Sequence, residues 1–156
     1  SVRCGIVKIA ICYYSRHHGN TRKVLEALAG EGEADLIDVT TRQAVRLEGY
    51  DRIGFASGVY YGKLHPSVPA FARQYLPEGK PVFFLCTYGA SRGKSLREME
   101  AVAREKYCPV LGAFGCRGYD TFGPLKLVGG IAKGHPNGRD LENARKFWRQ
   151  MKDSLG

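Results

Sequence analysis

The sequence predicts a doubly wound α/β fold, in which a parallel sheet carries helices on both faces. Five short apolar segments alternate with segments of helical periodicity, the order that produces parallel strands joined by crossover helices. The first apolar segment, residues 8–14, is almost continuously hydrophobic, as is typical of a strand covered on both faces. Three unusual loops, residues 15–21, 57–66 and 87–94, each follow a predicted strand. They should meet at the carboxyl edge of the sheet, where ligands of this fold class bind.

The predicted strands are short apolar runs bounded by glycine, proline or charged residues. The connection over residues 40–51 is predicted to hold no more than one helical turn. In chain order the strands cover residues 8–14, 35–39, 52–57, 81–86 and 110–116.

The predicted helices are recognised by apolar residues spaced three and four positions apart. We expect the third helix to end near Tyr107 and Trp148 to anchor the last helix against the sheet. In chain order the helices present Val24, Leu25 and Leu28; Val68, Phe71 and Tyr75; Leu96, Met99 and Ala103; and Leu141, Ala144, Trp148, Met151 and Leu155.

Length and composition predict one domain, residues 1–156, with an ordinary core. The chain is 44% hydrophobic and 25% charged, which is typical of soluble globular proteins. No stretch approaches the ~20 apolar residues of a membrane span. The first apolar run is short and interrupted by Lys8, so we interpret it as a strand and not as a signal peptide. A cytoplasmic location is expected.

The cysteine pattern predicts reduced, buried thiols. There are 5 cysteines, an odd number, and no two have the C-x-x-C spacing. Cys12, Cys86 and Cys116 lie inside predicted strands. The histidines do not pair with cysteines at metal-ligand spacings, so no metal site is expected.

The net charge of +9 favours an acidic partner or a phosphorylated ligand. Residues 1–25 carry 5 basic side chains and no acid: Arg3, Lys8, Arg16, Arg22 and Lys23. The sequence lacks the pattern of basic and aromatic residues that marks nucleic-acid binding, so nucleic acid is not an expected partner.

The loop between the first strand and the first helix suits a phosphate. Backbone N–H groups and the helix dipole would favour an anion there. Gly19 permits close approach, and Ser15, Asn20 and Thr21 supply side-chain donors. The alternative is an ordinary helix start capped by Asn20 or Thr21.

Residues 117–138 are too long for a simple connection and contain 6 glycines and 2 prolines. They follow a strand, so one hypothesis is a lid or docking surface over the same edge. The alternative is a surface connection packed on its own Phe122, Leu125 and Leu127.

These segments together resemble the flavodoxins. Residues 15–21, Ser-Arg-His-His-Gly-Asn-Thr, are similar to the FMN phosphate loop of that family. Asp51–Gly62 resembles its first isoalloxazine loop, and Thr87–Ala90 the second. Cys116–Asn137 is similar to the tail of a flavodoxin-like branch with His-His-Gly-Asn-Thr loops.

The resemblance implies a flavodoxin-like strand order 2-1-3-4-5, FMN as cofactor and electron transfer as function. Tyr60, Tyr61 and Tyr88 would stack on the flavin ring. No catalytic acid or base is assigned, because a one-electron carrier needs none. The implied cofactor-binding residues are Ser15, Arg16, His17, His18, Gly19, Asn20, Thr21, Ser57, Gly58, Val59, Tyr60, Tyr61, Gly62, Thr87, Tyr88, Gly89 and Ala90.

The chain departs from the family pattern in two respects. Its phosphate loop has one more residue between Ser15 and Gly19, with His-His in place of the usual hydroxyl. Flavodoxins are usually acidic, whereas this chain is basic and places Arg16 in the loop. We therefore expect its redox partner protein to present an acidic docking face.

Three alternative functions remain open at this point. The first is an FMN-dependent reductase of quinones or other small acceptors, which would oxidise NAD(P)H rapidly in steady state. The second is a cofactor-free flavodoxin fold that serves as a binding module, which would fail to take up FMN.

The third alternative is a phosphatase built on Cys86-x5-Arg92. Cys86 would attack phosphorus, Arg92 and backbone N–H groups would hold the oxyanion, and Asp120 would act as general acid. Gly93, however, replaces the hydroxyl residue common after that arginine. Cys86→Ser would abolish turnover under this hypothesis and leave flavin binding almost unchanged.

Overall fold

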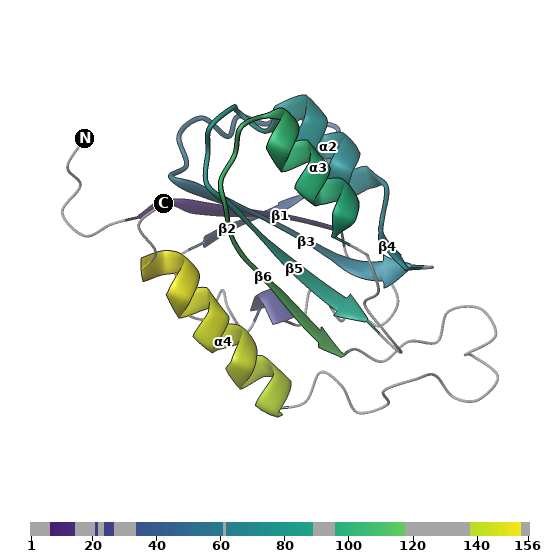
Figure 1. Cartoon of the computed structure of the whole chain (residues 1–156), viewed down its shortest axis with the longest axis vertical. Coiled ribbons are helices and arrows are strands. Elements are labelled where there is room, and N and C mark those ends of the chain that lie inside the picture. Colours follow the sequence, from purple (N-terminus) through teal and green to yellow (C-terminus); the bar gives the residue numbers. More distant parts are fainter. Residues whose placement is uncertain are drawn as a thin grey trace.

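A parallel sheet forms the centre of the computed structural model, which describes residues 7–14, 21, 24–26, 34–60, 62–88, 96–117 and 138–153 (Figure 1). The parallel strands lie in the order β2-β1-β3-β5-β6, and the short β4 pairs antiparallel with β3. Counting the five parallel strands alone, this is the order 2-1-3-4-5, so the predicted fold class and strand order are confirmed. The strands are β1 (Ile9–Tyr14), β2 (Ala34–Asp38), β3 (Arg52–Tyr60), β4 (Lys63–Leu64), β5 (Val82–Tyr88) and β6 (Val110–Arg117).

Helices cover both faces of the sheet. α2 (Ser67–Tyr75) and α3 (Arg97–Glu105) lie on one face, and α4 (Gly138–Asp153) lies on the other (Figure 1). Thr21 and residues 24–26 are also helical. Val24 and Leu25 belong to the apolar cluster that contains the buried residues of α4, so this first helical segment packs on the α4 face.

Side chains alternate between the two faces along each central strand, as a pleated strand requires. On β5, Phe84 and Cys86 belong to the cluster beneath α2 and α3, whereas Phe83 and Leu85 belong to the cluster beneath α4. All four side chains are at most 3% exposed. Burial on both faces explains why this strand is an uninterrupted apolar run in the sequence.

The periodicity of α4 is confirmed by its burial. Ala144, Trp148 and Met151, spaced four and three residues apart, are at most 4% exposed and face the sheet. Trp148 is completely buried, with its ring 6.2 Å from that of Phe83. Trp148 is therefore the core anchor that the sequence predicts.

An arginine side chain joins the start of β3 to the end of α4. The buried Arg52 guanidinium donates hydrogen bonds to the carbonyl groups of Met151, at 2.9 Å, and of Lys152. Burial lowers the pKa of Arg52 from its ordinary value, but an arginine remains charged at neutral pH. Its positive charge complements the carboxyl end of the α4 dipole, so Arg52 serves as a helix cap from another element.

The end of β3 differs from the prediction. The expected loop over residues 57–66 is wrong in part, because β3 continues to Tyr60 and turns back into β4. Val59 pairs with Leu64 and Tyr60 with Lys63, which makes a tight hairpin. Gly62 has a φ of +79°, a conformation that glycine adopts without strain. The buried Leu64 side chain holds the returning strand against the core.

One other boundary differs from expectation. α3 ends at Glu105, before Tyr107, because Tyr107 adopts a left-handed φ of 56° and the chain turns towards β6. Residues 40–51 contain no helical turn. Leu47, which is fully buried, attaches this connection to the core beneath α2 and α3.

Residues 118–137, for which a lid or a surface connection is predicted, lie outside the described residues. Among the helices that the structure describes, none combines the length and apolar character needed to cross a membrane.

Gly54 gives a test of the packing between the sheet and α4. A Cβ atom at Gly54 would lie 2.5 Å from the ring of Phe83, which is enclosed by Phe147 and Trp148. We expect Gly54→Ala to lower the free energy of unfolding by about 1–3 kcal/mol, measured by urea denaturation.

The matched control for that variant is Gly49→Ala. Gly49 is exposed and a Cβ atom there would meet nothing within 4 Å, so we expect a change within about 0.5 kcal/mol. Phe83→Leu should reduce the loss caused by Gly54→Ala. Equal stabilities of the two alanine variants would contradict this account of the packing.

Candidate functional site

Three strands reach the carboxyl edge of the sheet side by side, and β3 and β5 extend beyond the last residue of β1. Tyr14 of β1 pairs with Ser57 of β3, and Ser57 pairs with Cys86 of β5. One position further along, Gly58 pairs with Thr87. The predicted cofactor segments that follow these strands therefore begin from a common edge, as the sequence predicts.

Two threonine hydroxyls meet on the α4 side of this edge. The Oγ1 atoms of Thr21 and Thr87 lie 2.9 Å apart, and both residues are at most 6% exposed. Either hydroxyl can donate. This hydrogen bond joins the end of the predicted phosphate loop to the end of β5. The sequence identifies both residues as cofactor candidates but does not predict their contact.

The Ser57 side chain stabilises the β3–β4 hairpin through two hydrogen bonds. Its hydroxyl donates to the carbonyl group of Gly58 at 2.7 Å and accepts from the backbone N–H of His65 at 3.1 Å. Ser57 is fully buried, on the face covered by α2 and α3. In this structure its hydroxyl therefore holds the chain that returns from the hairpin to α2.

An aromatic pair lies on that same side of the edge. The rings of Tyr14 and His65 are stacked, with centroids 3.6 Å apart and an interplanar angle of 9°. Nδ1 of His65 accepts from the backbone N–H of Ser67 at 3.2 Å and lies 2.7 Å from the Ser67 hydroxyl. Because Nδ1 accepts a hydrogen bond, the neutral ring carries its proton on Nε2.

Sequence analysis did not identify Tyr14 or His65 as site residues. Their positions in the sequence could have indicated a place near the site. Tyr14 ends an apolar strand, and His65 immediately precedes Pro66 at the start of a helix. Tyr88 and Val59 are partly buried and pack on the same cluster as Tyr14. The edge thus has a hydroxyl side, with Thr21 and Thr87, and an aromatic side.

The other predicted cofactor residues divide into two groups. Gly58 is buried within β3, and Gly62 is exposed at the hairpin turn. Tyr60 is described as the last residue of β3. The remaining predicted residues lie outside the described part of the chain: Ser15, Arg16, His17, His18, Gly19, Asn20, Tyr61, Gly89 and Ala90.

Cys12, Cys86 and Cys108 are packed in the core. Burial raises the pKa of the Cys12 thiol to about 12, and Cys86 is 1% exposed in the cluster beneath α2 and α3. Burial also raises the pKa of Cys108. Cys12, Cys86 and Cys108 are in no disulfide, which confirms the prediction of buried thiols for Cys12 and Cys86.

The burial of Cys86 counts against the phosphatase hypothesis, because a nucleophilic cysteine requires access to its substrate and a stabilised thiolate. Arg92 and Asp120, the other members of that motif, lie outside the described residues. Within the described ranges, no three histidine, cysteine or acidic side chains are grouped so that they could hold a metal ion.

Comparison with known proteins supplies the family. Residues 10–115, more than half of the chain, match the model of a flavodoxin domain. The chain belongs to the flavodoxin family. The match includes the carboxyl ends of β1, β3 and β5, which form the edge described above.

One relative matches the chain in sequence, and solved structures match it in fold. An uncharacterized protein of Methanocaldococcus jannaschii is 38% identical over 147 residues, covering 93% of this chain and 98% of its own. A flavodoxin structure from the domain Archaea matches 94% of this chain and 96% of its own, with a TM-score of 0.69 and 18% identity. A flavoprotein of Lactobacillus acidophilus, solved in complex with FMN, matches 70% of this chain and 93% of its own, with a TM-score of 0.56 and 17% identity. Both structural likenesses show the fold.

The interaction energy of the hydrogen bond between Thr21 and Thr87 can be measured by a double-mutant cycle. Thr21→Val and Thr87→Val should each lower the free energy of unfolding by about 1–3 kcal/mol, because each leaves a buried hydroxyl without its partner. The double variant should lose less than the sum of the two, by about 0.5–1.5 kcal/mol. Urea denaturation measures all four proteins.

Thr40→Val is the control for that cycle. The Thr40 hydroxyl also donates a short hydrogen bond, 2.6 Å to Asp38, but at an exposed turn where water can replace it. Thr40→Val should therefore lower the free energy of unfolding by less than either Thr21→Val or Thr87→Val. Strict additivity of the Thr21 and Thr87 variants would show that the two hydroxyls do not interact.

Proposed function

We propose that this chain binds FMN at the carboxyl edge of its sheet and serves as an electron carrier. The observation that carries the proposal is the register that sets Tyr14, Ser57 and Cys86 side by side, which brings the starts of all three predicted cofactor segments to one edge. The hydrogen bond between Thr21 and Thr87 fixes the first helical segment to the end of β5. Family membership and the FMN complex of the Lactobacillus acidophilus flavoprotein support the choice of FMN.

The described residues fit the two chemical parts of FMN. The side of the edge with Thr21 and Thr87 is rich in hydroxyl groups and adjoins the start of a helix, an arrangement that suits a phosphate. The opposite side carries Tyr14, His65 and Tyr88, which suit a flat aromatic ring. We expect the phosphate to bind residues 15–21 and the ring to lie between residues 57–62 and 87–90. Bound FMN would supply a ring that takes up and releases electrons.

A reductase of small acceptors is the second candidate, and one observation favours it. An apolar cavity adjoins Gly62, a predicted ring contact, and could admit a small molecule. Rapid steady-state oxidation of NAD(P)H by the isolated protein would favour the reductase over the carrier.

The proposal includes a cytoplasmic location and an acidic redox partner. The odd number of cysteines and the lack of a C-x-x-C pair support the location. The net charge of +9 supports the partner. On α4, Arg139, Lys146 and Arg149 are exposed, and Glu142 lies 3.5 and 3.6 Å from two arginine side chains of the same helix.

The cofactor is tested by a visible absorbance spectrum of the purified protein before and after addition of FMN and dialysis. We expect flavin absorbance bands and about one FMN per chain. Thr21→Val should weaken FMN binding, whereas the exposed Thr40→Val should not. A colourless protein that takes up no FMN would contradict the proposal and favour the cofactor-free binding module.

The proposal that the redox edge is positively charged is tested with two small oxidants of opposite charge. The oxidation of the FMN-loaded, reduced protein by anionic ferricyanide should slow several-fold between about 20 and 200 mM salt, because salt screens an attraction. Oxidation by the cationic hexaamminecobalt(III) ion should accelerate over the same range. Stopped-flow absorbance measures both rates, and equal salt dependence for the two ions would refute a positive redox edge.

A further inference from the structure

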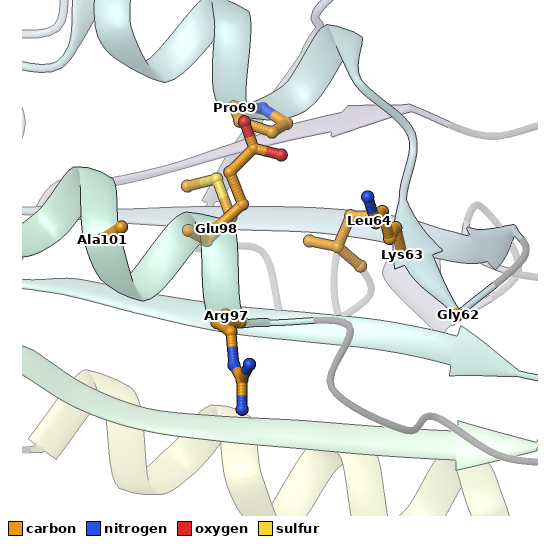
Figure 2. Close-up of a pocket in the computed structure, with 8 residues that line it drawn as sticks. Gly62, Lys63, Leu64, Pro69, Arg97, Glu98 and Ala101 are labelled. Carbon is orange, nitrogen blue, oxygen red and sulfur yellow. The ribbon is translucent and has the colours of Figure 1, made fainter.

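A cavity lies between the β3–β4 hairpin and the first turns of α2 and α3 (Figure 2). Its volume of about 500 Å³ is within the range of small-molecule sites. Leu64, Pro69, Met99 and Ala101 give it an apolar lining. Leu64, Pro69 and Met99 are buried residues of three different elements, so the cavity wall is part of the packed core and not a gap between surface side chains.

The charges around the cavity are not balanced. Lys63, Arg97 and Glu98 all line it, and Figure 2 shows Glu98 extending towards Pro69 and Arg97 extending the opposite way. The Glu98 carboxylate accepts a hydrogen bond from Arg73 of α2 at 2.9 Å, so its charge is already paired. Within the described part of the chain, neither Lys63 nor Arg97 forms an ion pair.

Among the described residues that line the cavity, the two charged side chains without an ion pair, Lys63 and Arg97, are both positive. An anionic ligand is therefore favoured over a neutral or cationic one. The apolar lining requires that most of such a ligand be hydrophobic.

The cavity is separate from the proposed phosphate site. It lies on the face covered by α2 and α3, whereas the hydrogen bond between Thr21 and Thr87 is on the α4 side of the sheet. Among the predicted cofactor residues that the structure describes, Gly62 alone lines the cavity.

We propose that this cavity binds a small organic anion with an apolar body, of the class of hydrophobic carboxylates. The apolar body packs against Leu64, Pro69 and Met99, and the carboxylate lies at the side of the cavity that carries Lys63, with Arg97 adding to the positive potential there. The site does not depend on FMN, and it would persist if the proposed redox function were wrong.

The test uses 2-naphthoate and its neutral counterpart 2-naphthamide, titrated into the purified chain with and without saturating FMN. Isothermal calorimetry should show one site per chain that binds the anion more tightly than the amide. Arg97→Gln and Lys63→Gln should each weaken naphthoate binding by about two- to fivefold and leave naphthamide binding unchanged. Ala101→Leu, which fills the cavity, should weaken both ligands.

The control is Arg104→Gln, which removes the same charge from the same helix at an exposed position that does not line the cavity. Equal effects of Arg97→Gln and Arg104→Gln would overturn the proposal, as would equal affinity for the two ligands. Competition between FMN and naphthoate would also overturn it, because the cavity would then belong to the cofactor site. Loss of FMN uptake with retained naphthoate binding would refute the proposed function alone.

Discussion

The register of β3 between β1 and β5 is the constraint on which the rest of the structure depends. Both faces of the central strands are buried, so a slip of one residue would move every side chain to the opposite helix layer. Phe83 and Phe84 illustrate this, because Phe83 packs beneath α4 and Phe84 beneath α2 and α3. The same register brings Tyr14, Ser57 and Cys86 level at the carboxyl edge. Core packing and the assembly of the site are therefore consequences of one set of strand pairings.

The two ends of β3 connect this register to the helices on both faces. At its start, Arg52 caps the carboxyl end of α4. In its interior, Gly54 leaves room for the Phe83 ring, which in turn packs against Trp148 of α4. At its end, Ser57 holds the chain that leads through His65 into α2. One strand thus positions a helix on each side of the sheet.

Local patterns were sufficient for most of the fold, and contacts between distant residues account for what they missed. Apolar runs identified all five parallel strands, and the spacing of Ala144, Trp148 and Met151 identified the buried face of α4. The β3–β4 hairpin was missed because its two strands pair over only two positions, which leaves no alternating pattern to detect. In the site, Thr21 was recognised from loop chemistry and Thr87 from the resemblance to the family. Their contact spans 66 positions and depends on strand register, which no local pattern encodes.

The hydrogen bonds at the carboxyl edge suggest a division of roles between strand ends and loops. The hydroxyls of Thr21 and Thr87 are bonded to each other, and that of Ser57 is bonded to backbone groups of the hairpin. A hydroxyl that is committed to an internal partner stabilises the framework, and binding a ligand through it would require that bond to be shared or broken. The strand ends are therefore best suited to hold the loops at fixed positions. Under the proposed function, recognition of the phosphate would fall mainly to residues 15–20, where His17 and His18 replace the family's usual hydroxyl and Arg16 adds a cation. A phosphate loop with cationic side chains gains electrostatic attraction that the neutral loop lacks, and part of that attraction is lost as salt increases.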